Sequence, residues 1–205
     1  MTCIPLHGQD TLQQMQELYN GTIWIDNLSV LKGHQFLFAW QFRPGTVTIR
    51  GKTFPVGLRY DIYADQVQIS AGRFGVLQLN KELIDSFSLT EKGRNLNFVP
   101  LIHKGSVDFY QELYTGDVSL YARYIKKIDR LNRTDEQRGF YQVMRIFFVK
   151  NGDFIDVSRK KDLIGSMADR ITEVRLFMRT NNLKINRHDP ESFVPVVRHY
   201  DNLTR

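Results

Sequence analysis

The chain has 205 residues, of which 42% are apolar and 24% charged, and it carries a single cysteine, Cys3. This composition is that of an ordinary globular protein and excludes a disulfide scaffold, a coiled coil, collagen and wholesale disorder. The formal net charge is +6, and the longest basic run is Arg159-Lys160-Lys161. Nucleic-acid-binding arms usually carry longer blocks, so we expect a solvated charged surface and no nucleic-acid partner.

The sequence has no apolar run of about 20 residues, so we expect no transmembrane segment. Residues 1–9 are uncharged, and Ile4–Gln9 is similar to the cleavage end of a signal peptide. We expect residues 1–9 to be a tail or a signal-peptide remnant on a periplasmic or secreted protein. If Met1 is the true start, a cytoplasmic location is expected instead.

Helical spacing behind Asp10 predicts a short helix over residues 10–19. From Thr22 to about Val157, runs of Val, Ile, Phe and Tyr are broken by turn residues every 8–12 positions, which is typical of strands. The expected strands are 22–25, 36–42, 46–49, 53–58, 59–63, 67–69, 75–79, 83–89, 95–103, 109–114, 118–128, 140–149 and 154–157.

Two hairpins are especially clear. Thr115-Gly116-Asp117 and Asn151-Gly152 each separate a pair of expected strands, and Asn-Gly favours a type I′ turn. The strand over 140–149 is apolar on both faces, so we expect it to be central and covered on both sides. Residues 131–139 are polar and predict an exposed loop.

After Ser158 the apolar residues recur at spacings of three and four, which predicts helices. The first is broken near Gly165–Asp169, and a last helix runs from Asp189-Pro190 to about Tyr200. We therefore expect an α+β, mostly β fold: an antiparallel sheet or partly open barrel with C-terminal helices packed on it. The chain is expected to be a single domain over 1–205, β-rich over 20–157 and helical over 158–205.

No catalytic constellation is readable, and we expect a non-enzymatic protein without metal or cofactor. None of the five histidines has a partner at metal-ligand spacing. Ser158 and Lys161 match the Ser-x-x-Lys spacing of some hydrolases, but helix capping by Ser158 is the commoner role. Asp61 and Asp65 fall at a hairpin tip, where carboxylates usually bond their own backbone.

Aromatic residues are the strongest remaining hint of a ligand. Tyr110, Tyr114 and Tyr121 fall on two paired strands and are the candidate ligand-binding residues. Further rings and cations on the expected strands are Trp40, Tyr60, Tyr63, Arg123, Lys126 and Lys127. Such a pattern can stack on bases or sugars, although cross-strand packing is its more frequent role.

Several segments resemble a family of uncharacterised exported proteins of Gram-negative bacteria. They are Leu58–Asp65, Phe109–Tyr121, Arg159–Ile164, Phe177–Leu183 and His199–Leu203. The resemblance covers most of residues 20–203 and implies export and a partner in the envelope or on a surface. It implies no catalytic residue, because that family has none assigned.

Two functions remain open. One is a non-enzymatic exported domain that binds a surface or a partner. The other is a half-barrel cup, closed by the C-terminal helices, for a small hydrophobic or anionic ligand. An aromatic-lined pocket of roughly 300 Å³ or more favours the cup, and a solid core favours the first.

Overall fold

The structure is a computed structural model that describes residues 18–28, 31–129 and 138–204. The tail expected over 1–9 lies outside these residues, as do nearly all of the helix expected over 10–19 and most of the loop expected over 131–139.

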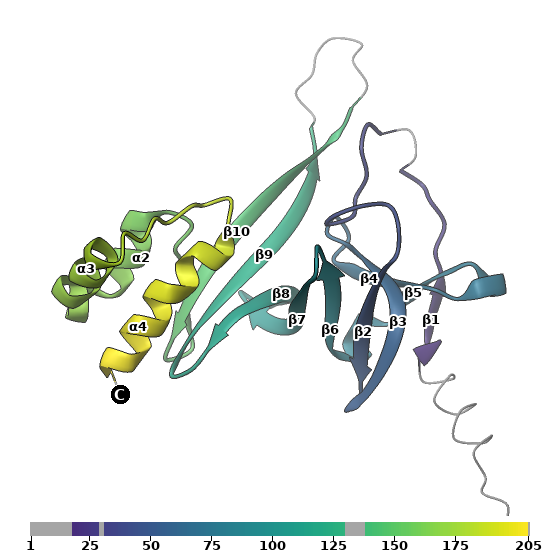
Figure 1. The fold of residues 1–205 in the computed structure, drawn as a ribbon. Helices are drawn as coiled ribbons and strands as arrows, with labels where there is room; N and C mark the ends of the chain where they lie inside the picture. The colour runs from purple at the N-terminus through teal and green to yellow at the C-terminus, as the bar shows by residue number, and fades with distance from the viewer. Residues whose placement is uncertain (1–17, 29–30, 130–137, 205) are drawn as a thin grey trace, which may run out of the picture. The chain divides into compact units, whose positions relative to one another are not determined.

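The strands form one antiparallel sheet with the order β1-β5-β4-β3-β2-β6-β7-β8-β9-β10-β11 (Figure 1). Their bounds are β1 Gly21–Ile23, β2 Arg43–Ile49, β3 Lys52–Asp61, β4 Gln66–Ser70, β5 Val76–Leu79, β6 Ile84–Glu91, β7 Arg94–His103, β8 Ser106–Thr115, β9 Val118–Ile128, β10 Phe140–Lys150 and β11 Asp153–Asp156. The three C-terminal helices are α2 Lys160–Ser166, α3 Ile171–Thr180 and α4 Val194–Thr204. The expected α+β, mostly β class with an antiparallel sheet is confirmed.

The chain divides into two compact units, one of residues 1–96 and 126–141 and the other of residues 97–125 and 142–205. We call them unit 1 and unit 2. The division does not fall at Ser158, where the sequence changes from strand to helix, because the C-terminal helices share a unit with parts of β7–β10 and with β11. The expectation of a single domain stays a prediction.

In unit 2 the helices pack on one face of the strands, as expected. The buried cluster that they form with β9 and β10 consists of Val118, Leu120, Ile146, Phe148, Val157, Leu163, Met167, Val174, Met178, Phe193, Val194, Val196, Val197 and Tyr200. Helical spacing after Ser158 therefore identified a true apolar face. Phe177 was expected in that face, but it is only partly buried and its ring stacks on His199 instead.

Asp201 ties α4 to the β8–β9 hairpin. Its carboxylate is fully buried and accepts hydrogen bonds from the Tyr114 hydroxyl at 2.8 Å and from the backbone N–H of Val118 at 3.0 Å. The hairpin turn comes so close that a Cβ on Gly116 would lie 2.3 Å from Oδ2 of Asp201. Glycine is required at this turn for the close approach of a side chain from α4.

We expect Asp201→Ala to lower the free energy of unfolding by about 3 kcal/mol, because it leaves a buried backbone donor and a hydroxyl without their charged acceptor. Asp189→Ala is the matched control: Asp189 is exposed, and although it is at the N-terminal cap of the following turn its side chain accepts no capping hydrogen bond. Urea denaturation followed by circular dichroism measures both. Equal losses for the two variants contradict this role of Asp201.

In unit 1 a buried arginine organises the segment over 36–42. Arg59 on β3 is 4% exposed, and its guanidinium donates to the backbone oxygen of Trp40 and to the side-chain oxygen of Gln68. Four ring centroids lie 4.0–5.0 Å from it, those of Trp24, Phe36, Trp40 and Phe42. Burial lowers the pKa of Arg59 to about 10, against the opposing charge of Asp61.

The strand expected over 36–42 is wrong. Within this segment only Phe36 forms a bridge, to Asp61. The rings of Trp40 and Phe42 lie against the Arg59 guanidinium instead. A dense run of aromatic residues has the composition of a strand, but here the cation–π contacts of a distant residue determine its path.

Candidate functional site

The structure brings two of the three candidate tyrosines together in unit 2. Tyr110 is fully buried, and its ring lies 6.4 Å from that of Tyr121, 5.7 Å from that of Phe147 and 5.9 Å from that of Phe154. His103 on β7 stacks on Phe154 on β11 at 4.7 Å. These rings pack on one another, as the cross-strand packing interpretation predicts.

Tyr114 does not join that cluster. Its ring packs against the helix-covered core, and its hydroxyl is engaged with Asp201. Arg123 lies 5.8 Å from the Tyr110 ring and forms an ion pair with Asp108 at 2.7 Å. The three tyrosines therefore do not face one common site, and a ligand-binding role for any of them stays a prediction.

The two hairpin carboxylates of unit 1 have separate partners. Oδ1 of Asp61 accepts the backbone N–H groups of Tyr63 and Ala64, each at 2.9 Å, while Asp65 accepts from the Tyr60 hydroxyl and pairs with Lys81. Burial raises the pKa of Asp61. Among the described residues there is no cluster of three or more His, Cys, Asp or Glu side chains able to hold a metal ion.

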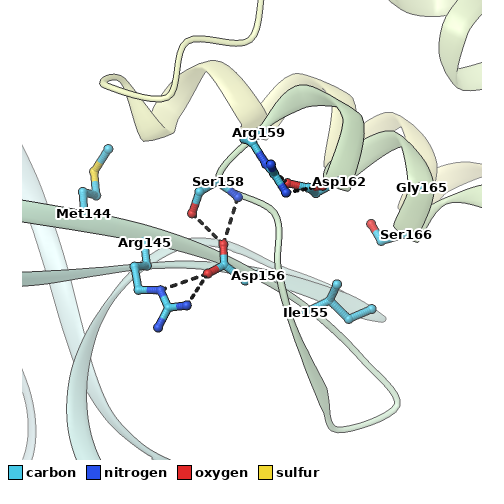
Figure 2. Close-up of a pocket in the computed structure, with 9 residues that line it drawn as sticks. All are labelled: Met144, Arg145, Ile155, Asp156, Ser158, Arg159, Asp162, Gly165 and Ser166. Carbon is cyan, nitrogen blue, oxygen red and sulfur yellow. Dashed lines mark hydrogen bonds and ion pairs between the residues drawn. The ribbon is translucent and has the colours of Figure 1, made fainter.

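An open groove of about 830 Å³ lies in unit 2 where the sheet meets α2 (Figure 2). The chain reaches it from β10, β11 and the first helix after the sheet. Its lining residues are Met144, Arg145, Ile155, Asp156, Ser158, Arg159, Asp162, Gly165 and Ser166. Of these, only Ser158 had been weighed for a catalytic role from the sequence alone.

The groove exists because β11 is much shorter than β10. β11 pairs with Phe147–Lys150 only, and the next residue, Val157, donates its N–H to the carbonyl of Ile146 at 2.8 Å. The chain then turns away into α2. In the part of the chain that the structure describes, no strand lies beside Gln142–Arg145 on the β11 side.

Ser158 ends the pairing. Its Oγ accepts the backbone N–H of Ile146 at 3.0 Å. The same hydroxyl donates to Oδ1 of Asp156 at 2.7 Å, as Figure 2 shows. The prediction that Ser158 caps the helix is wrong, because the residue at the N-terminal cap of α2 is Arg159. The serine hydroxyl replaces a strand carbonyl at the point where β11 stops.

We expect Ser158→Ala to lower the free energy of unfolding by about 1–2 kcal/mol, because the N–H of Ile146 and the Asp156 carboxylate both lose a hydrogen bond. Ser166→Ala is the control: its hydroxyl donates to the Leu163 carbonyl within α2, so a change within about 0.5 kcal/mol is expected. Urea denaturation compares the two. A Ser158→Ala value no larger than the control rules out this role.

The charged side chains of the groove are arranged in pairs. Arg145 bonds Oδ2 of Asp156 through two nitrogens, at 2.9 and 2.8 Å, and Arg159 bonds Asp162 at 2.6 and 3.1 Å. Burial tends to raise the pKa of Asp156, but the hydrogen bonds from Ser158 and the charge of Arg145 outweigh it and hold the pKa below its usual value. This carboxylate therefore stays ionised near neutral pH.

The lowered pKa of Asp156 predicts a pH dependence of stability. The unfolded-state pKa of aspartate is about 3.9, so the stabilisation is fully present above that pH and is lost as the pH falls through the lower folded-state value. In Asp156→Asn we expect a shallower loss of stability between about pH 5 and pH 2 than in the wild type. Denaturation midpoints across that range measure it, and parallel acid limbs contradict the prediction.

Comparison of the chain with protein-family models, with curated proteins and with solved structures found no match. Within the described ranges, no helix is both long enough and apolar enough to cross a membrane. The geometry and chemistry of the groove are therefore the basis for a functional proposal.

Proposed function

We propose that the chain is a non-enzymatic binding domain that engages a partner through the groove of unit 2. The observation that carries this is an open hollow of about 830 Å³ in which partly exposed apolar side chains lie beside exposed arginines. A few polar groups in a partly apolar concavity are typical of binding sites.

The chemistry of the lining favours binding over catalysis. Asp156 and Asp162 are each held by an arginine, so both carboxylates are already engaged in ion pairs. The Ser158 hydroxyl donates to Asp156 and accepts from a backbone N–H, which is a structural role. The lining contains no histidine to activate it as a nucleophile.

The packing of the aromatic residues favours the groove over the cup. A cup for a small ligand needs an open space among Tyr110, Tyr121 and their neighbours. The Tyr110 side chain is fully buried, with other rings on several sides. That cluster of rings is therefore packed core of unit 2, whereas the groove at the sheet edge is open to solvent.

Export of the protein is a further part of the proposal. It depends on the resemblance of segments such as Leu58–Asp65 and Phe109–Tyr121 to exported proteins of Gram-negative bacteria. A partner in the envelope or on a cell surface is consistent with that location.

Gly165 offers a sharp test of the groove. A Cβ built there meets no atom within 4 Å, and the residue lies in α2, where replacing glycine favours the helix. Gly165→Trp therefore introduces a bulky ring at the groove from a position with room for a Cβ, and Gly165→Ala is the matched control that leaves the groove open. We expect immobilised wild type and Gly165→Ala to retain the same host proteins from an envelope extract, and Gly165→Trp to retain at least tenfold less.

Thermal melts check that all three proteins are folded, and quantitative mass spectrometry reads the retained proteins. Equal retention by Gly165→Trp contradicts binding in the groove. If no variant retains a host protein above a blank matrix, the chain is not a binding domain for a protein partner.

A further inference from the structure

We propose that the occupant of the groove is an extended acidic segment of a partner protein, which adds as a strand to the open edge of β10. This inference depends on the proposed function and specifies the ligand class of the same groove. Strand addition to a sheet edge is a general mode of peptide recognition in which backbone hydrogen bonds supply much of the affinity.

The backbone N–H and C=O groups of β10 face the side on which a strand would add. The N–H and C=O of Ile146 face the β11 side, since they bond Ser158 and Val157. Backbone groups alternate in direction along a strand, so those of Met144 face the same side. Beyond Ser158, among the described residues, no strand covers this side at Met144. An incoming strand would continue the line of β11.

The groove also offers apolar surface that every second side chain of such a strand can contact. Met144 is partly buried against the helix-covered core, and Ile155 is 38% exposed. Both line the groove, and in Figure 2 they lie on opposite sides of the Asp156 network. Successive side chains of a strand point to opposite faces, so apolar residues at every second position of the ligand can contact these surfaces.

The exposed charge of the groove is positive. The side chains of Arg145 and Arg159 are 52% and 66% exposed, whereas those of their partners Asp156 and Asp162 are 37% and 25% exposed. The next residues along α2, Lys160 and Lys161, are exposed as well. Arg145 alternates with Met144 along β10 and so lies on the face away from the helix-covered core, where acidic side chains of the added strand would meet it. The cations at the start of α2 add positive charge beside the added strand, which favours an acidic ligand over a basic one.

The edge geometry favours a single extended chain over other anionic partners. A membrane surface or a nucleic-acid duplex can reach the exposed arginines and lysines, but it cannot bond the backbone of Met144 beside α2. A second copy of this chain would need an exposed acidic strand of its own. These occupants are distinguished by the experiment.

The experiment uses a display library of random twelve-residue peptides, selected on the full chain and counter-selected on Gly165→Trp. We expect enriched peptides in which apolar and acidic residues alternate. Fluorescence anisotropy of the labelled peptides then gives the Kd. Backbone N-methylation at every second residue should weaken binding at least tenfold in one register and less than twofold in the other, because only alternate N–H groups face β10.

Charge is tested with a matched pair of variants. Arg159→Glu should raise the Kd of an enriched peptide at least tenfold. Arg179→Glu, the same change on an exposed residue of α3 outside the groove lining, should alter it less than twofold. This pair also tests the groove without relying on Gly165→Trp.

The inference is overturned if no peptide is enriched, if enriched peptides are basic, or if both N-methyl registers bind alike. It is also overturned if anionic vesicles or duplex DNA bind the chain and Arg159→Glu weakens that binding while peptides do not bind. The open groove could still retain a host protein although the peptide selection fails. That result would leave the proposed function standing and would reject only the extended acidic ligand. Concentration-dependent dimerisation lost in Gly165→Trp would assign the groove to a second copy and reject the inference.

Discussion

The site depends on one interaction, the hydrogen bond from the backbone N–H of Ile146 to the Ser158 hydroxyl. It satisfies the edge of β10 at the point where β11 stops pairing. The same hydroxyl donates to Asp156, which in turn is held by Arg145. Because the chain leaves the sheet here and enters α2, the helix stands over an edge that β11 would otherwise cover. A longer β11 would remove the groove.

The helices that stand over this edge are held by a buried charge as well as by apolar packing. Asp201 on α4 accepts from the Val118 backbone and from Tyr114, and it approaches Gly116 so closely that a side chain there would collide. A buried carboxylate is costly unless donors surround it, so this contact specifies one position for α4 on the β8–β9 hairpin. α2, which lines the groove, packs in the same buried cluster as α4, so its position on the strands is defined as well.

Much of the fold was predictable because its signals are local. The Thr115-Gly116-Asp117 and Asn151-Gly152 turns, the helical spacing after Ser158 and the break near Gly165 all appear where the sequence indicated. The failures involve contacts between distant residues. The aromatic run over 36–42 has strand composition, yet it packs on Arg59, and no local pattern shows that a cation will be buried there.

The groove was missed for the same reason. Ser158 precedes a helix, so capping was the natural interpretation of its hydroxyl, and the true acceptor role became visible only with the pairing of β10 and β11. One signal was present in the sequence: a long apolar strand before Asn151-Gly152 is followed by only a few strand-like residues before the helix. A hairpin with unequal arms must leave part of the longer arm unpaired by its partner.

The open edge of β10 is tested most directly by residue-resolved hydrogen–deuterium exchange on the free protein. Phe148 is paired with Ile155 in β11, so its amide should exchange slowly. The amide of Met144 lies on the same side of the same strand beyond the end of β11, and we predict that it exchanges at least a hundredfold faster. Comparable protection of the two amides would show that this edge is already covered and would contradict the account.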